Sequence, residues 1–296
     1  MDALEQYQDL STKTIGGFIP IGKMLPRSFI LRVGPRIQQL LISFIQSTKR
    51  GSERILIPGG FERVYLYHVR KTAGTSLSRA FLSLGGESPR SVEGRIASSI
   101  LSRTKSGPYG YATGIGALQQ GDYLFGWSHV PAHKLRLPER TFEIATLRDP
   151  VARLLSYYRY LVAGDRTDET GWTVQSSERA LMGANFEEFL SRIPDELLLT
   201  QLYMFSASFD VDEAVDRLLA CQELVFTESI VSDTERLATR LEITLDLRKE
   251  RVTSEEAFEP NDMQVKILRE RLAPEYEMME RLTQRLREQG GPRPAD

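Results

Sequence analysis

The chain has 296 residues, of which 41% are hydrophobic and 26% are charged, and its formal net charge is −2. This composition is typical of a folded globular protein and excludes a disordered chain, a collagen-like repeat and a membrane protein with several spans. The single cysteine, Cys221, excludes a disulfide framework within the chain and a cysteine-based zinc cluster, and the near-neutral charge gives no global signature of nucleic-acid binding.

The N-terminal part is basic and holds the most apolar stretch. Lys and Arg outnumber Asp and Glu over 1–110, so this part could face an anionic ligand, or balance the acidic remainder across an internal interface. Residues 1–5 do not resemble a signal peptide, and charges and prolines interrupt the apolar run over 15–45 before it reaches the ~20 residues of a membrane span. We expect a helical extension over 1–50, with a helix at 36–45 that packs on the domain or a partner subunit. Peripheral membrane contact is the alternative, a homo-oligomer stays open, and we expect a cytoplasmic location.

The rest of the chain alternates between strand and helix patterns. In chain order we expect a strand (64–69), a helix (76–84), a long irregular insertion rich in Ser, Gly and Arg (87–122), strands at 123–130 and 142–147, helices at 150–163, 187–193, 197–205 and 211–220, a strand (223–227), a helix (232–241) and a long helix (261–289) with a break at Pro274. Such alternation predicts one α/β domain over 51–289, with a parallel sheet covered by helices on both faces. Residues 290–296 are expected to form a flexible tail.

The segment Tyr67–Leu77 (YHVRKTAGTSL) predicts a strand, a tight loop and a helix start. Unpaired N–H groups at a helix N-terminus bind phosphate or sulfate, small residues let an anion approach, and hydroxyl and lysine side chains add donors. The alternative is an ordinary strand-to-helix turn with a capping residue. The segment is not a Walker A loop, because its lysine precedes its single glycine, and Gly114-Ile-Gly116 lacks the spacing of a dinucleotide fingerprint.

A second segment, Leu147–Tyr160 (LRDPVARLLSYYRY), begins where a strand ends. Arg148 lies at the position where α/β folds place ligand contacts, and Ser156 lies two turns into the following helix. The two side chains could hold one phosphate together. Alternatively, Arg148 pairs with Asp149 or another carboxylate and Ser156 only faces a neighbouring helix.

Together, the two segments resemble the carbohydrate sulfotransferases of the heparan sulfate 2-O-sulfotransferase-like group, sulfotransferase family 2. Glu223–Ser229 and the helix to Leu241 resemble the family's late strand-helix unit. The resemblance implies a P-loop-NTPase-like three-layer fold and transfer of a sulfuryl group from 3′-phosphoadenosine 5′-phosphosulfate (PAPS). It also implies that a loop binds the 5′-phosphosulfate and that a second pair of residues binds the 3′-phosphate. The loop residues are Lys71, Thr72, Ala73, Gly74, Thr75 and Ser76, the pair is Arg148 and Ser156, and Arg70, where the family usually has proline, adds a positive charge that could contact the cofactor or an acidic acceptor.

Attack by a hydroxyl on sulfur calls for a general base. Related enzymes carry a catalytic histidine at the place in the chain order where this sequence has His129, so His129 and Lys71 are the candidate catalytic residues. His133 is the alternative base, His68 is interpreted as a packed strand residue, and Glu62 and Glu143 are weaker candidates.

The function we expect is sulfuryl transfer from PAPS to a hydroxyl, by family analogy that of a saccharide or glycoconjugate. No metal-binding cluster is visible in the sequence, and no nucleic-acid partner is expected. Two alternatives are a nucleotide-dependent kinase, which the missing Walker A spacing disfavours, and a non-catalytic module that binds a nucleotide or a polyanion.

Overall fold

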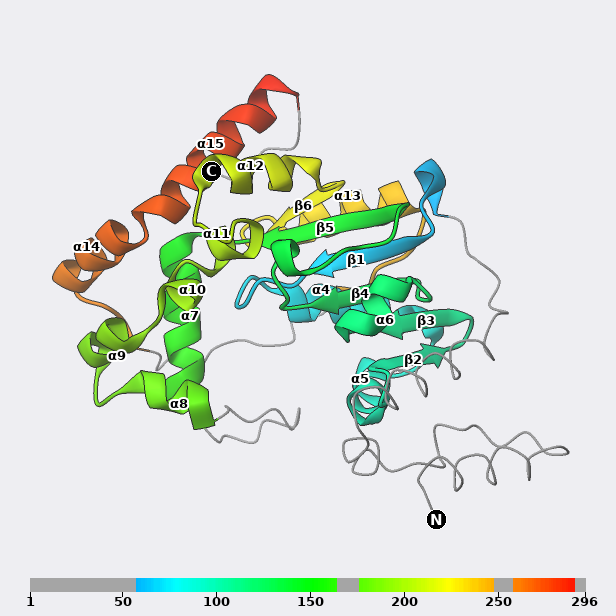
Figure 1. Ribbon diagram of the computed structural model, residues 1–296, viewed down its shortest axis with the longest axis horizontal. Coiled ribbons are helices and arrows are strands. Elements are labelled where there is room, and N and C mark those ends of the chain that lie inside the picture. Colours follow the sequence, from blue (N-terminus) through cyan, green and yellow to red (C-terminus); the bar gives the residue numbers. More distant parts are fainter. Residues whose placement is uncertain (1–56, 164–175, 248–257, 291–296) are drawn as a thin grey trace, which may run out of the picture.

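The computed structural model describes residues 57–163, 176–247 and 258–290, which form an α/β structure around one sheet (Figure 1). The sheet has six strands in the order β2-β3-β4-β1-β5-β6. All neighbours pair in parallel except β2 and β3, which form an antiparallel pair at one edge. The predicted α/β fold with a largely parallel central sheet is confirmed. The strands are β1 (Arg63–Tyr67), β2 (Arg103–Ser106), β3 (Tyr109–Ala112), β4 (Phe125–Ser128), β5 (Thr141–Leu147) and β6 (Glu223–Phe226).

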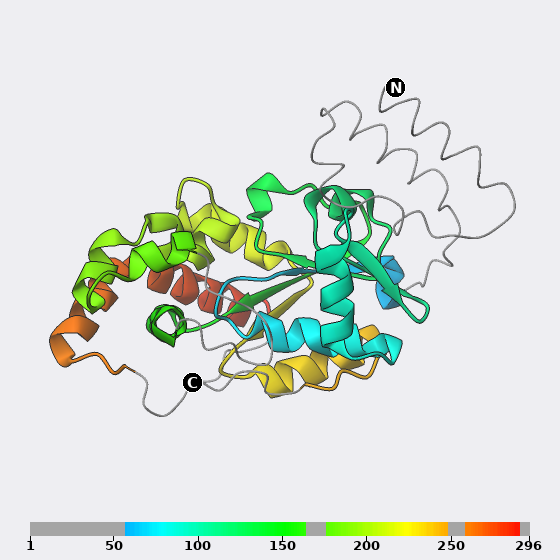
Figure 2. The ribbon, with the colours of Figure 1, turned by 90° about the horizontal axis from the view of Figure 1, so that it is seen from below.

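Side chains of the central strands alternate between two helical layers. Val64 and Leu66 of β1 belong to one hydrophobic cluster, with α4 (Gly74–Leu82), α5 (Pro89–Ser98) and α13 (Ile230–Leu241). Tyr65 and Tyr67 belong to the other, with α6 (Ile115–Gln120) and α12 (Val211–Ala220). Figure 2 shows α4 and α13 on one side of the sheet and α12 on the other. Because both faces are covered, every residue of β1 is buried.

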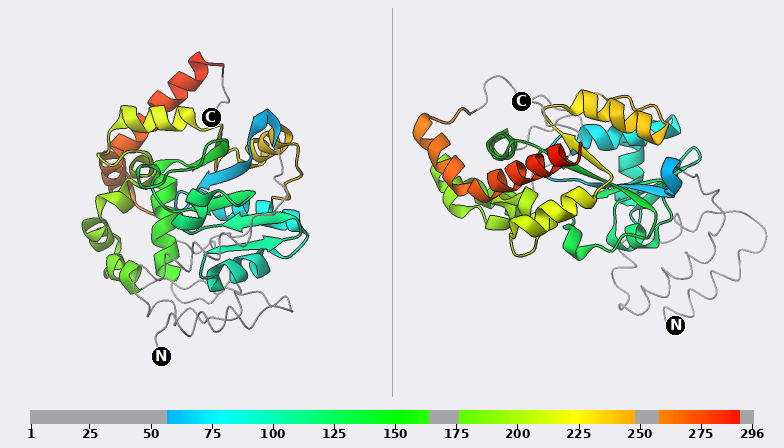
Figure 3. Two further views of the ribbon diagram at one scale, coloured as in Figure 1. Left: turned by 45° about the vertical axis from the view of Figure 1, so that its right-hand side comes forward. Right: turned by 90° about the horizontal axis from the view of Figure 1, so that it is seen from above.

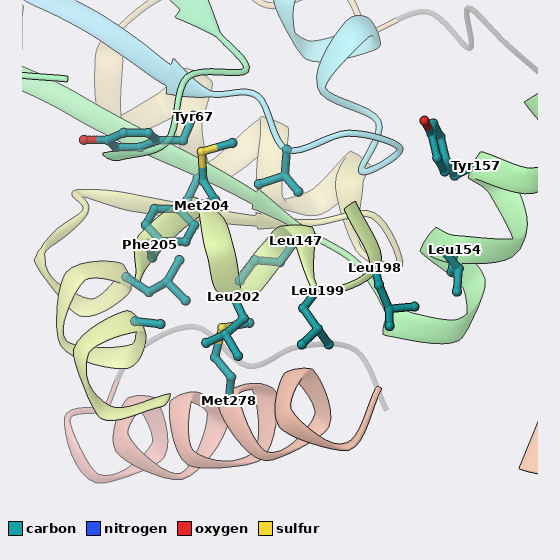
Figure 4. Packing of buried hydrophobic residues seen from close by; sticks show 14 of the residues in the cluster. Tyr67, Leu147, Leu154, Tyr157, Leu198, Leu199, Leu202, Met204, Phe205 and Met278 are labelled. Atoms are coloured by element: carbon teal, nitrogen blue, oxygen red, sulfur yellow. The ribbon is translucent and has the colours of Figure 1, made fainter. Parts of the chain in front are cut away.

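The remaining helices lie at the end of the sheet where β5 leads into α7 and beside α12. They are α7 (Pro150–Ala163), α8 (Ser176–Met182), α9 (Phe186–Arg192), α10 (Asp195–Leu198), α11 (Thr200–Phe205), α14 (Asp262–Arg271) and α15 (Ala273–Glu288). Figure 3 shows α15 alongside α12. In Figure 4, Leu202 of α11 and Met278 of α15 point toward each other beneath the strand residues Tyr67 and Leu147. The C-terminal helices therefore complete the core near the ends of β1 and β5.

One helix prediction needs its boundaries changed, and a predicted helix break is confirmed. The predicted helix over 197–205 is divided at Leu199, whose backbone leaves the helical region, into α10 and α11. The break predicted near Pro274 is confirmed, because α14 ends at Arg271 and Pro274 lies in the first turn of α15, where proline fits without loss of a hydrogen bond.

The prediction that 87–122 is an irregular insertion is wrong. The segment contains α5, the β2–β3 hairpin and α6. Its glycines and proline mark element boundaries: Pro89 opens α5, Gly107 turns the hairpin with φ +54°, and Gly121 ends α6 with φ +76°. The predicted extension over 1–50 and residues 291–296 of the predicted tail lie outside the described residues.

Candidate active site

The carboxyl ends of four parallel strands, β4, β1, β5 and β6, meet at one end of the sheet. Tyr67 pairs with both Ser128 and Ala145, and Leu147 pairs with Phe226. The loops that follow these strands, at 68–73, 129–131, 148–149 and 227–229, are therefore neighbours. Figure 1 shows the loop between β1 and α4 at the end of the sheet near α7 and α11. This is the place where open α/β sheets bind ligands.

The loop between β1 and α4 is held in an unusual backbone conformation. Lys71 and Ala73 have positive φ angles of 68° and 59°, a left-handed conformation that is uncommon outside glycine and concentrates at functional sites. The Thr72 hydroxyl is buried, donates to the carbonyl of Val69 at 2.8 Å and lies 2.7 Å from the hydroxyl of Thr146 on β5. Thr72 therefore anchors the loop to the sheet, and its predicted contact with the ligand stays a prediction.

The first turn of α4 has the properties of an anion site. Its N-cap is Ala73, which provides no side-chain cap, and no acidic residue lies in the first turn. The first N–H groups of a helix have no intrahelical acceptor and carry partial positive charge. Thr75 and Ser76 add half-buried hydroxyl side chains to this turn. The predicted alternative, a turn closed by a capping side chain, is not what the structure contains.

Gly74 allows the His68 side chain to approach the start of α4 closely. A Cβ atom at this position would lie 2.1 Å from Cδ2 of His68, and no real Cβ comes so near to another atom. The glycine thus makes room for the imidazole of His68, which packs over the start of α4. Its predicted role of letting an anion approach the loop stays a prediction.

Arg148 and Lys71 are brought together although 77 positions separate them. The Arg148 guanidinium donates to the carbonyl oxygen of Lys71 at 3.2 Å. The Lys71 ammonium lies 4.7 Å from the centre of the Tyr160 ring on α7. Ser156 precedes Tyr160 by one turn and so lies on the same face of α7. The two predicted phosphate-binding segments therefore share one site.

Asp149, one carboxylate considered as a partner for Arg148, uses both of its oxygens in other hydrogen bonds, although its charge and that of Glu228 still act on Arg148. One carboxylate oxygen of Asp149 accepts the N–H of Ala152 at 2.7 Å and caps α7, and the other accepts the hydroxyl of Tyr276 at 2.8 Å. The Gln201 side chain holds the peptide of Arg148 by accepting its N–H at 2.8 Å and donating to its carbonyl at 3.0 Å. Sequence reasoning missed Gln201, because a single glutamine in a helical pattern carries no signal of a distant partner.

His129 follows β4 and lies beside His68. Its Nδ1 is 2.5 Å from the carbonyl oxygen of His68, and the two rings are 4.5 Å apart. Because a carbonyl oxygen only accepts, Nδ1 carries the proton and Nε2 keeps a lone pair in the neutral ring. The side chain keeps an exposed edge, but surrounding protein atoms desolvate it, and this desolvation together with the charge of Arg70 lowers the pKa of His129 to about 4. His129 is therefore a neutral imidazole at pH 7, the protonation state that a general base needs.

Arg70 is paired with a carboxylate within the protein. Its guanidinium donates to Glu178 of α8 at 2.6 Å. This ion pair joins α8 to the loop, and the contact of Arg70 with cofactor or acceptor stays a prediction. Arg70 also acts on His129 through its charge.

A cavity of about 240 Å³ opens beside His129. The other lining residues come from the loop after β1, the segment after β4 and helices α10 and α11: Arg70, Pro131, Lys134, Glu196, Leu197, Thr200, Tyr203 and Met204. Lys134 donates to the hydroxyl of Tyr203 at 3.0 Å. Neither residue was singled out from the sequence, because both lie in segments without a recognisable motif.

The other candidate bases lie elsewhere or have other contacts. His133 packs edge-on against Tyr203, with ring centres 5.2 Å apart, and does not line the cavity. Glu62 pairs with Arg63 and Arg140 at the opposite end of the sheet. Glu143 accepts the hydroxyl of Tyr67 within the sheet at 2.7 Å. Among the candidates, His129 is the one placed at both the loop and the cavity.

The described parts of the chain contain neither a cluster of metal ligands nor a helix that could span a membrane. Within those residues no group of three His, Cys, Asp or Glu side chains is arranged to hold a metal ion. In the same residues no helix combines the length and apolar character needed to cross a membrane.

Comparison with known families identifies the family of the chain. The family model described as "Sulfotransferase family" matches residues 60–247, more than half of the chain and a span that includes β1 to α13. No curated protein and no solved structure gives a significant match. The chain belongs to the sulfotransferase family.

Proposed function

We propose that this member of the sulfotransferase family uses PAPS as its sulfuryl donor and sulfates a hydroxyl of a saccharide or glycoconjugate. Family membership establishes sulfuryl transfer and implies a hydroxyl acceptor. The observation that carries the choice of PAPS is the convergence of an uncapped helix N-terminus, Lys71 and Arg148 at one strand end.

The residues present fit the charge and donor requirements of PAPS. The nucleotide carries two separate anionic groups, and the site offers two sets of donors. The N-terminus of α4, with Thr75, Ser76 and Lys71, suits the 5′-phosphosulfate. Arg148, whose guanidinium can bind a phosphate in a fork, and Ser156 suit the 3′-phosphate.

When bound, PAPS supplies an activated sulfuryl group, whose bond to the phosphate oxygen breaks as a bond to the acceptor oxygen forms. Lys71 supports transfer by placing a positive charge at the loop, where negative charge develops on the departing oxygen. The amides of α4 are fixed before reaction, so they need no reorganisation. Positioning and electrostatics would then carry most of the catalysis, as in phosphoryl transfer.

His129 is the proposed general base. Its Nδ1–H is held by the carbonyl of His68, which orients Nε2 and leaves it able to take the proton of the acceptor hydroxyl. The lowered pKa keeps the ring neutral in the physiological range. A low pKa also makes the ring a weak base, so the acceptor proton is best transferred late, when the S–O bond is largely formed.

The cavity beside His129 is the proposed acceptor site. Its volume of about 240 Å³ suits one sugar ring. Tyr203 provides an aromatic face, and Lys134 and Glu196 provide polar groups for hydroxyls. The lining carries both signs of charge, which favours an acceptor recognised ring by ring over a continuous polyanion.

The test combines nucleotide binding with transfer. Calorimetric titration should show tight binding of 3′-phosphoadenosine 5′-phosphate (PAP) and at least tenfold weaker binding of ADP, because Arg148 is proposed to bind a 3′-phosphate, which ADP lacks. Radiolabelled PAPS should then label a member of a saccharide panel. Equal binding of ADP and PAP would contradict the choice of donor. PAP binding with labelling of phenols or peptides, and of no saccharide, would contradict the choice of acceptor.

A further inference from the structure

The C-terminal helix α15 lies beyond the residues that match the family, yet its first turn reaches the site. Glu275 is fully buried, with 0% of its surface exposed. One of its carboxylate oxygens accepts the N–H of Gln201 at 2.7 Å and that of Leu202 at 3.4 Å, and the other accepts the Gln201 side-chain amide at 3.1 Å. Glu275 therefore holds both the backbone and the side chain of Gln201.

Gln201 links Glu275 to the residue that follows β5, Arg148, through hydrogen bonds. Its Oε1 accepts the N–H of Arg148, and its Nε2 donates to the Arg148 carbonyl and to Glu275. The amide thus uses its acceptor and both donors in one geometry. A rotation of the Gln201 side chain would break contacts on two elements at once, so the peptide of Arg148 is fixed relative to α15.

The next residue of α15 holds the next residue of the strand end. The Tyr276 hydroxyl donates to Asp149 at 2.8 Å, on the carboxylate oxygen that does not cap α7. Consecutive residues of α15, Glu275 and Tyr276, therefore fix consecutive residues Arg148 and Asp149. Pro274 sets the start of α15 just before them.

Arg153 neutralises the buried carboxylate. It is 1% exposed, its Nε lies 3.5 Å from Glu275, and its guanidinium donates to the carbonyls of Leu197 and Leu198 at the end of α10. A buried ion pair is weak as a source of stability, since apolar residues of similar size often stabilise as well or better. α15 already packs through Met278, Leu282 and Leu286. The polar network is therefore better explained by orientation of the strand end than by attachment of the helix.

We propose that Glu275 and Tyr276 of α15, acting through Gln201 and Asp149, are positioning residues that hold Arg148 in place for its anionic ligand. The inference rests on the proposed function, because it takes Arg148 as the group that binds the 3′-phosphate. It assigns part of the nucleotide site to a helix outside the family-matched segment 60–247.

Two variants of the full chain test the proposal. Tyr276→Phe removes one hydroxyl from a half-buried side chain, and Gln201→Met removes both contacts to Arg148 at similar volume. Thr283→Val is the matched control, because its hydroxyl donates to Met279 within α15 and does not reach the site. Calorimetry with PAP and with adenosine 5′-phosphate (AMP), which lacks the 3′-phosphate, is performed below the unfolding temperature of each variant.

PAP affinity should fall about fivefold in Tyr276→Phe, which loses the hydrogen bond to Asp149. It should fall about tenfold or more in Gln201→Met, which loses the two hydrogen bonds that hold the Arg148 peptide. AMP affinity should stay within about twofold, and Thr283→Val should bind both nucleotides as the wild type does. Selective loss of PAP supports the proposal.

Unchanged PAP affinity in Tyr276→Phe, or an equal loss of PAP and AMP affinity, would overturn the proposal. If the unfolding temperature of that variant also falls, Tyr276 has a merely structural role. If Gln201→Met does not fold, Tyr276→Phe decides alone. A wild-type protein that binds no PAP would instead overturn the proposed function, and the inference with it.

Discussion

Arg140 and Arg148 flank the same strand, β5, but their guanidinium groups have different hydrogen-bond partners at the two ends of the sheet. At the amino end, the Arg140 guanidinium donates to the carbonyl of Gly60 at 2.6 Å and to the carboxylate of Glu62 at 2.9 Å. At the carboxyl end, the Arg148 guanidinium donates to the carbonyl of Lys71 at 3.2 Å, and Asp149 beside it is engaged with α7 and Tyr276.

The amino end is neutralised within the protein. Arg63, 6% exposed, donates to Glu62 and to the carbonyls of Gly121 and Glu139. At the carboxyl end, left-handed residues and an uncapped helix lie beside Lys71 and Arg148, whose charge the nearby carboxylates Glu228 and Asp149 offset without a direct ion pair to Asp149. Arginines held directly by carboxylates serve the fold, whereas an uncapped helix start beside two cations favours the carboxyl end as the place that binds an anion.

Replacement of Lys71 should give the largest effect at the carboxyl end. Lys71→Met removes the charge beside the departing oxygen, so kcat should fall by about 10²- to 10³-fold, as when one transition-state donor is lost. The measurement is steady-state transfer from radiolabelled PAPS. Lys105→Met on the exposed side of β2 is the control and should leave kcat unchanged. A decrease of less than about threefold in Lys71→Met would remove Lys71 from catalysis.

Replacement of the two arginines that flank β5 tests the difference between the ends directly. Arg148→Ala should weaken PAP binding by about 10- to 100-fold, the loss of a charge-assisted contact to phosphate. Arg140→Ala should leave PAP binding within about twofold and lower the stability by at most ~1 kcal/mol, because its ion pair is half-exposed. Calorimetry and thermal unfolding on both variants check this. Equal effects of the two variants on PAP would show that the two ends do not differ as proposed.

Gly74→Ala should damage the carboxyl end through packing alone. The new methyl group would overlap the His68 ring, so either the ring or the helix start must move, at a cost of about 1–3 kcal/mol. Because the His68 carbonyl orients His129, transfer should fall as well. The control is Gly94→Ala in α5, where nothing lies within 4 Å of the added atom, and it should stabilise by up to ~1 kcal/mol. Unfolding curves that coincide for the two variants would refute the packing explanation.

The sequence was sufficient for the parts of the site that are local in the chain. Local sequence patterns predicted β1, the loop at 70–76 and the start of α7 at Asp149-Pro150, because strand, turn and capping signals act over a few residues. The motif pair also predicted that Arg148 and the loop share one site.

Contacts between distant elements could not be derived in this way. Glu275 gives no sign in the sequence that it is buried against Gln201, because a glutamate in a charged helix usually faces solvent. Likewise, the Arg70–Glu178 pair joins segments more than a hundred residues apart. The segment 87–122 was misassigned because its glycines and serines suggested a loop, whereas several of them end or begin short elements.

The smallest effect we expect concerns the pH dependence that Arg70 imposes on His129. Desolvation is the larger cause of the low pKa of His129, about 4, and the Arg70 charge adds to it by opposing a second positive charge nearby. The base acts in its neutral form, so kcat/KM for the wild type should be level from about pH 5.5 to 8 and should decline only as the pH approaches this pKa.

Arg70→Gln removes the opposing charge but keeps a hydrogen-bonding group for Glu178. Because the positive charge is gone, the pKa of His129 should rise. The acid limb of the kcat/KM profile should therefore move to higher pH, yet stay below ~6.5, the ordinary value for histidine, because the desolvation remains. Lys134→Gln is the control: it removes a cation from the same cavity that does not contribute to the shift of His129, so it should change the height of the profile and not the position of its limb. A limb that stays in place or moves to lower pH in Arg70→Gln would contradict electrostatic control of His129, and desolvation by neighbouring protein atoms would then account alone for the low pKa of His129.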